Sequence, residues 1–124
     1  MTRPSIRLAT VNIDCADAQA MADFYGRLLG WEITLRDDDF ILMRDPAGGA
    51  GLSFQEQPWY LPPVWPEQPG EQHKMIHLDI QVGDLDAAVA FALEAGARLA
   101  AHQPRHDLRV LLDPAGHPFC LFLV

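Results

Sequence analysis

Two polar side chains in the second half of the chain are spaced for joint chemistry. His77 and Asp79 are two residues apart in a stretch that alternates polar and apolar residues, so in a strand they point to the same face. Imidazole transfers protons readily near neutral pH, and a buried carboxylate needs a cationic or hydrogen-bonding partner. We expect His77 to line a ligand pocket beside Asp79; a role as acid or base and a structural, hydrogen-bonded role are the alternatives.

The first half of the chain repeats this pattern about 67 residues earlier. Thr10 and Asn12 stand where His77 and Asp79 stand in the second half, and apolar residues alternate with them. Both halves therefore direct polar side chains to one face of a strand and apolar side chains to the other. Because helices are expected to cover the apolar faces, we interpret the polar faces as lining a cavity; a solvated outer face is the alternative.

Aromatic side chains gather in a proline-rich segment between the halves. Trp59, Tyr60 and Trp65 alternate with prolines there, and such rings stack well on planar ligands. The alternative is that they cap the core or lie in a dimer interface. We assign the apolar contacts with a ligand to these three residues together with Phe54 and Phe122.

The remaining candidates for chemistry are cysteines and histidines. Cys15 and Cys120 are too few for a disulfide framework and indicate a reducing compartment. We interpret both as packed thiols rather than nucleophiles, and place Cys120 among the residues that line the ligand site. Four further histidines are expected at exposed edges and turns: His73, His102, His106 and His117.

A repeated turn motif organises the whole chain. Asp45-Pro46-Ala47-Gly48 recurs as Asp113-Pro114-Ala115-Gly116, and each copy fits a type I turn. The chain is therefore one supersecondary unit written twice, and the two copies must share a core because neither is large enough alone.

Each copy predicts the order β-α-β-β-β. In copy one we expect strands at 6–14, 31–35, 40–43 and 52–55, and a helix that begins after Asp17 and ends at Gly30. In copy two we expect strands at 77–82, 98–101, 108–112 and 119–124, and a helix between Asp84 and Gly96. The expected fold is α+β: two βαβββ modules, at about 5–57 and 73–124, with a linker at about 58–72. Their sheets form a curved, half-open barrel with both helices outside.

Composition excludes several classes of partner. The 124 residues include 9 Lys and Arg against 17 Asp and Glu, a formal net charge of −8, so neither nucleic acid nor an anionic membrane is expected as a partner. No apolar signal core follows the first four residues, and no apolar run is long enough to span a membrane. We expect a cytoplasmic protein.

Several motifs together resemble the vicinal oxygen chelate superfamily, which includes glyoxalase I, extradiol dioxygenases and bleomycin-resistance proteins. They are the segment Asp23-Phe24-Tyr25-Gly26-Arg27-Leu28-Leu29-Gly30-Trp31, the two repeated turns, and His77-Leu78-Asp79-Ile80 with Gly96-Ala97. The last pair is similar to the glyoxalase-like domain branch. The resemblance implies the paired βαβββ fold and assembly as a homodimer.

The resemblance also implies four positions for metal ligands. Metal-dependent members place ligands on the first and last strands of each module, and the matching positions here hold Thr10, Leu52, His77 and Cys120. A one-residue slip would bring in Ser53. A catalytic zinc site needs about three protein ligands, so we expect no metal cofactor, although a divalent metal is the alternative.

Two functions follow from these expectations. The first is a metal-independent binding protein of the glyoxalase/bleomycin-resistance type, which holds a partly aromatic antibiotic or metabolite between the modules or at a dimer cleft. The second is a glyoxalase-like lyase or isomerase that acts on a small carbonyl compound, with His77 as base or metal ligand.

Overall fold

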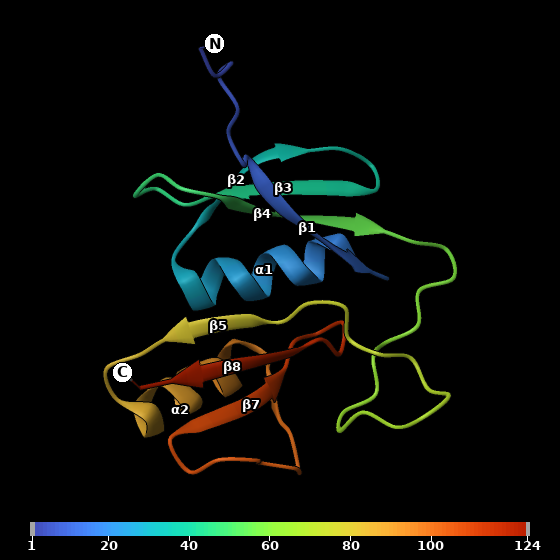
Figure 1. Ribbon diagram of the computed structural model, residues 1–124, viewed down its shortest axis with the longest axis vertical. Helices are drawn as coiled ribbons and strands as arrows, with labels where there is room; N and C mark the ends of the chain where they lie inside the picture. Colours follow the sequence, from blue (N-terminus) through green and yellow to red (C-terminus); the bar gives the residue numbers. More distant parts are fainter. Residues whose placement is uncertain (1, 124) are drawn as a thin grey trace.

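The computed structural model describes residues 2–123, and two similar modules joined by a linker make up the molecule (Figure 1). Module one contains β1 Thr10–Cys15, α1 Ala18–Leu29, β2 Glu32–Arg36, β3 Phe40–Arg44 and β4 Gly51–Glu56. Module two contains β5 Leu78–Gln81, α2 Leu85–Ala95, β6 Arg98–Leu99, β7 Leu108–Leu112 and β8 Pro118–Phe122. The predicted α+β class and the repeated βαβββ order are confirmed.

The two sheets have the same topology. Their strand orders are β1-β4-β3-β2 and β5-β8-β7-β6. In each module the last three strands are antiparallel neighbours, as predicted, while the first strand pairs in parallel with the last. The sheets stay separate and open, so each leaves one face uncovered by its own helix.

Matching side chains begin the two helices. The Asp17 carboxylate accepts from the Ala20 N–H at 3.0 Å, and the Asp84 carboxylate accepts from the Ala87 N–H at 3.0 Å. Each satisfies a backbone donor that the first turn of a helix leaves free. Gly30 ends α1 with φ 73°, a left-handed conformation that favours glycine.

Helix α1 is the centre of the shared core. Figure 1 shows it between the sheet of module one and strand β5. Tyr25 stacks on Phe54 of module one with ring centroids 5.6 Å apart, while Phe24 meets Phe119 of module two at 5.8 Å. One helix therefore buries apolar surface of both modules, which agrees with the expectation that neither copy has a sufficient core alone.

The two repeated turns are built alike. Gly48 donates to the Asp45 carbonyl at 3.0 Å, and Gly116 donates to the Asp113 carbonyl at 2.9 Å, which closes a type I turn in each module. The carboxylates of Asp45 and Asp113 also accept from the backbone two residues on. Asp113 differs in being completely buried.

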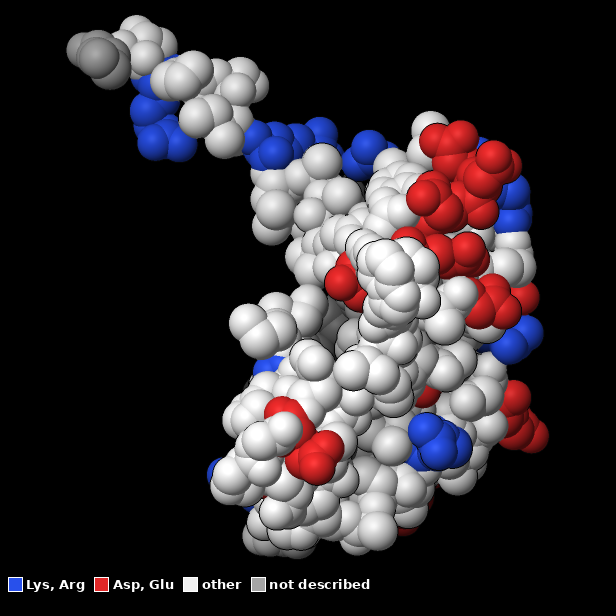
Figure 2. Space-filling model, turned by 90° about the vertical axis from the view of Figure 1, so that its right-hand side faces the viewer, with Lys and Arg blue, Asp and Glu red and all other residues white. Residues whose placement is uncertain are grey.

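The first predicted strand begins later than expected. Residues 2–9 are outside the sheet and project from the body (Figures 1 and 2). The neighbouring strand β4 begins at Gly51, which donates to the Ala9 carbonyl at 2.9 Å. No paired strand of module one extends further, so the apolar alternation before Ala9 does not form a ladder.

The strand expected at 98–101 is also shorter, because a side chain takes over its pairing. Gln103 accepts from the Val110 N–H at 2.8 Å and donates to the Val110 carbonyl at 2.9 Å. The Val110 carbonyl also accepts from the Ala100 N–H at 3.1 Å, so backbone pairing stops at the Val110 N–H, which the Gln103 side chain occupies. Within residues 2–123, no helix has the length and apolar character to cross a membrane.

Candidate functional site

The open face of module two brings three predicted site residues together. His77 Nε2 is 3.2 Å from Asp79 Oδ1, and Asp79 lies opposite Cys120 in the β5–β8 register. One donor atom from each of the three lies within 4.8 Å of the other two. His77 and Asp79 are exposed, whereas Cys120 is half-buried. The shared face that alternation predicted for His77 and Asp79 is present.

Module one carries a related group at the equivalent place. Thr10 Oγ1 lies 3.2 Å from Ser53 Oγ, and Asn12 Nδ2 donates to Ser53 Oγ at 2.9 Å. Asn12 is opposite Ser53 in the β1–β4 register, as Asp79 is opposite Cys120. Hydroxyl and amide groups thus replace the imidazole, carboxylate and thiol of module two.

This correspondence corrects the position expected for the last-strand ligand. Leu52 packs with the buried core, while Ser53 faces Thr10 and Asn12. The loop from the turn aspartate to the last strand is one residue longer in module one, so counting seven residues from Asp45 ends on the helix-facing Leu52. Ser53 is the counterpart of Cys120.

The three side chains clustered in module two suit a metal such as zinc better than the sequence predicted. Imidazole nitrogen, carboxylate oxygen and thiolate sulfur are the usual ligands of zinc, and three of them match a catalytic site with an open position. Sequence reasoning counted His77 and Cys120 but missed Asp79 as a third donor, although its spacing from His77 places it on the same face. Burial and the Asp79 carboxylate raise the pKa of the Cys120 thiol, so a metal would have to displace a bound proton.

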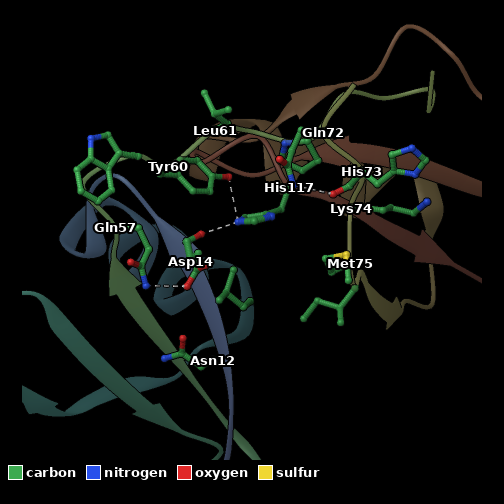
Figure 3. Close-up of a pocket in the computed structure, with 14 residues that line it drawn as sticks. Asn12, Asp14, Gln57, Tyr60, Leu61, Gln72, His73, Lys74, Met75 and His117 are labelled. Atoms are coloured by element: carbon green, nitrogen blue, oxygen red, sulfur yellow. Dashed lines mark hydrogen bonds between the residues drawn. The ribbon is translucent and has the colours of Figure 1, made fainter. Parts of the chain in front are cut away.

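A separate cavity lies at the junction of the modules and is shown in Figure 3. We call it the junction pocket; its volume is about 540 Å³, within the range of small-molecule sites. One side comes from β1 and the other from the linker, with His117 of module two between them. The 14 lining residues are Asn12, Ile13, Asp14, Gln57, Trp59, Tyr60, Leu61, Pro63, Gln72, His73, Lys74, Met75, Ile76 and His117.

Hydrogen bonds link three parts of the chain at the pocket floor. His117 Nε2 lies 2.6 Å from the Asp14 carbonyl oxygen and 3.1 Å from Tyr60 Oη. A carbonyl oxygen can only accept, so Nε2 carries a proton. The Tyr60 hydroxyl in turn donates to the Ala115 carbonyl at 2.7 Å. Burial, followed by the Asp113 carboxylate, raises the pKa of Tyr60, so its hydroxyl stays protonated as a donor.

Comparison with known proteins assigns this architecture to a family. The family model described as a glyoxalase-like domain matches residues 10–122. The chain belongs to the glyoxalase-like domain family. No curated protein matches it in sequence.

Solved structures with the same fold support the assignment. A glyoxalase/bleomycin resistance protein/dioxygenase family enzyme from Burkholderia phytofirmans PsJN is 25% identical, with a TM-score of 0.70 over 96% of this chain and 99% of that one. A glyoxalase family protein from Enterococcus faecalis is 23% identical, with a TM-score of 0.65 over 91% and 94%. A lactoylglutathione lyase from Agrobacterium tumefaciens is 15% identical, with a TM-score of 0.62 over 98% and 96%.

In this glyoxalase-like domain, the residues predicted from the sequence to form one ligand site lie in several separate places. Asn12, Trp59 and Tyr60 line the junction pocket. His77, Asp79 and Cys120 form the cluster on the open face of module two, and Phe122 follows Cys120 on β8. Thr10 belongs to the polar group of module one.

Two predicted aromatic contacts lie elsewhere. Phe54 is completely buried against Tyr25 beneath α1, so its ring is core and lines neither group. Trp65 donates to the His102 carbonyl at 3.3 Å, and the Lys74 ammonium lies 4.9 Å from the centre of its ring. It therefore anchors the linker to module two rather than lining the junction pocket.

Other residues that line the pocket of the domain were not assigned to the ligand site from the sequence. Asp14 and Gln57 meet at 3.3 Å on the floor, and Met75 lines the opposite side. His117 was expected to be exposed, but it is half-buried because β1 and Tyr60 cover it. Alternation in the first strand does predict that Asp14 shares the polar face of Thr10 and Asn12; nothing in the sequence indicated its contact with a residue 103 positions away.

Proposed function

We propose that this glyoxalase-like domain binds a small, partly aromatic organic molecule, an antibiotic or a metabolite, in the junction pocket without needing a metal. The observation that carries the proposal is the pocket itself, which combines an apolar side with a polar floor. Trp59 is 89% exposed and lies at its edge, where an indole can cover a planar ligand. Such a combination is typical of small-molecule sites.

Binding of a neutral aromatic probe tests this proposal. We expect naphthylmethanol to bind the wild-type protein, as measured by ligand-observed NMR and calorimetry. Trp59→Ala should weaken binding roughly fivefold, because an aromatic pair contributes about 1 kcal/mol. Trp65→Ala is the matched control and should change the affinity less than about twofold. Equal losses in the two variants, or no binding to the wild type, would refute the junction pocket as the ligand site.

A second copy of the chain is part of the proposal. Both sheets carry polar side chains on the face away from their own helix, and the resemblance to the superfamily implies a homodimer. Sedimentation equilibrium should give twice the mass of one chain; a mass equal to one chain at high concentration would contradict it.

The alternative function is a lyase or isomerase that acts on a small carbonyl compound. The cluster of His77, Asp79 and Cys120 favours it, and a lactoylglutathione lyase shares the fold. These side chains would hold a divalent metal, which when bound would polarise a carbonyl oxygen of the substrate. His77 without a metal would act as the base.

Metal analysis separates the two functions. Protein purified without chelator is examined for bound metal, and its melting temperature is measured with added Ni²⁺, Zn²⁺, Mn²⁺ and Fe²⁺. A near-stoichiometric metal that is lost in His77→Ala would support the enzyme and argue against metal-independent binding. If no metal is bound after purification and none of the four ions raises the melting temperature, the metalloenzyme function is excluded.

A further inference from the structure

A single carboxylate dominates the charge of the junction pocket. Asp14 lies on β1, on the open face of its sheet, and its side chain is exposed. In the described part of the chain its one side-chain hydrogen-bond partner is the Gln57 amide, which donates to Oδ1 at 3.3 Å. Among residues 2–123, no Lys, Arg or His side chain forms an ion pair with it.

The one basic side chain of the lining besides its histidines is committed elsewhere. The Lys74 ammonium pairs with Glu67 and lies over the Trp65 ring. Figure 3 shows Lys74 extending away from Asp14 and the pocket floor. It therefore leaves the Asp14 charge without a counterpart inside the pocket.

The nearby donors are also occupied. The proton on His117 Nε2 faces the Asp14 carbonyl, and the Tyr60 hydroxyl donates to Ala115. The Asp14 carboxylate on the floor thus has no cationic partner within residues 2–123, and the His117 and Tyr60 donors beside it already have acceptors. A ligand that brings its own positive charge and N–H donors complements this floor, whereas an anionic ligand is repelled.

The opposite side of the pocket defines the rest of the ligand. Trp59, Leu61, Met75 and Ile76 present apolar surface there and are all exposed. Figure 2, a view from the side of the linker, shows a broad cluster of Asp and Glu on the upper part of this face. Together with the net charge of −8, it favours the approach of a cation.

We propose that the ligand of the junction pocket is an organic amine with an aromatic or aliphatic body, and that Asp14 is its ionic partner. This inference rests on the proposed small-molecule function and specifies its ligand class. The ammonium group lies against Asp14, and the apolar body lies between the linker side chains and β1.

Three probes with one ring system test the inference at neutral pH and low ionic strength. They are naphthylmethylamine, which is cationic, naphthylmethanol, which is neutral, and naphthoate, which is anionic. We expect the amine to bind up to about fivefold more tightly than the alcohol, because an exposed ion pair contributes at most about 1 kcal/mol, and naphthoate to bind weakest. Asp14→Asn should reduce amine affinity to that of the alcohol and leave the alcohol within twofold.

The control removes the same charge far from the pocket. Glu94 is exposed on α2 and does not line the pocket, so Glu94→Gln should keep the preference for the amine. Equal binding of amine and alcohol to the wild type, or an amine preference that survives Asp14→Asn, would overturn the ligand class while the pocket function stands. Binding of none of the three probes would overturn both. The ranking in the wild type decides the matter even if Asp14→Asn does not fold.

Discussion

The two thiols of this protein lie in different environments although both cysteines belong to strands. Cys15 is completely buried in the core, and its thiol lies 3.6 Å from the Gln55 carbonyl. Cys120 is half-buried beside Asp79 on an open sheet face. Burial, followed by the Glu56 carboxylate, raises the pKa of Cys15 to about 12, which agrees with the expectation that it is not a nucleophile.

This difference predicts selective alkylation. With a pKa of about 12, roughly one Cys15 thiol in ten thousand is ionised at about pH 8, so iodoacetamide should modify Cys120 in the folded protein and Cys15 only after unfolding. Peptide mass spectrometry measures the two rates. Equal rates in the folded state would contradict the burial of Cys15. If the metalloenzyme function holds, added Zn²⁺ should slow the reaction of Cys120.

At the scale of elements, the internal repeat extends from the turns to the strand register. Asn12 opposite Ser53 corresponds to Asp79 opposite Cys120, so the two modules place side chains at equivalent points of one scaffold. The scaffold is common to both modules, while the side chains differ. A fold of this kind therefore accommodates different chemistry in its two halves.

The close approach of β3 and β4 requires a glycine at the start of β4. A Cβ added to Gly51 would lie 2.2 Å from the Met43 carbonyl oxygen, which is backbone and cannot rotate away. Gly51→Ala should lower the free energy of unfolding by about 2 kcal/mol or more, measured by urea denaturation. Gly83→Ala is the control, because nothing lies within 4 Å of its added Cβ. Equal stability of the two variants would show that β3 and β4 can separate without cost.

At the scale of the whole molecule, one buried hydrogen bond ties the modules together. Tyr25 of α1 donates to Asp113 Oδ2 at 2.7 Å, and the other carboxylate oxygen accepts from Ala115 and His117 within its own turn. Burial raises the pKa of Asp113, while His117 and the Tyr25 hydrogen bond oppose that rise.

Removing the Tyr25 hydroxyl should lower the free energy of unfolding by an amount that depends on pH. A carboxyl group whose pKa is raised by folding binds more protons in the folded state, so its contribution to stability falls as pH rises above the ordinary carboxyl range. Tyr25→Phe removes a donor to the ionised form and should cost about 1–3 kcal/mol, more at about pH 7 than at about pH 4. Urea denaturation at the two pH values measures the difference.

The control variant is Asp113→Asn, which has no ionisable group at this position. Its free energy of unfolding should lose the corresponding pH dependence. A pH profile of Tyr25→Phe that runs parallel to the wild type would show that the hydroxyl does not act on the carboxylate.

The sequence by itself determined the repeated βαβββ order, both helix caps, the type I turns and the shared face of His77 and Asp79. These features depend on contacts between residues close in the chain, such as Asp17 with Ala20, and on the two-residue period of strands. Family membership followed from the same local motifs.

Only the tertiary structure decided which polar residues meet. Asp14 and His117 are 103 residues apart and share a pocket because β1 and the turn of module two converge on the linker. Phe54 and Ser53 are adjacent and both completely buried, yet Phe54 stacks on Tyr25 in the core while Ser53 contacts Thr10 and Asn12. Periodicity identifies two faces of a strand, but only packing between distant segments establishes what each face contacts.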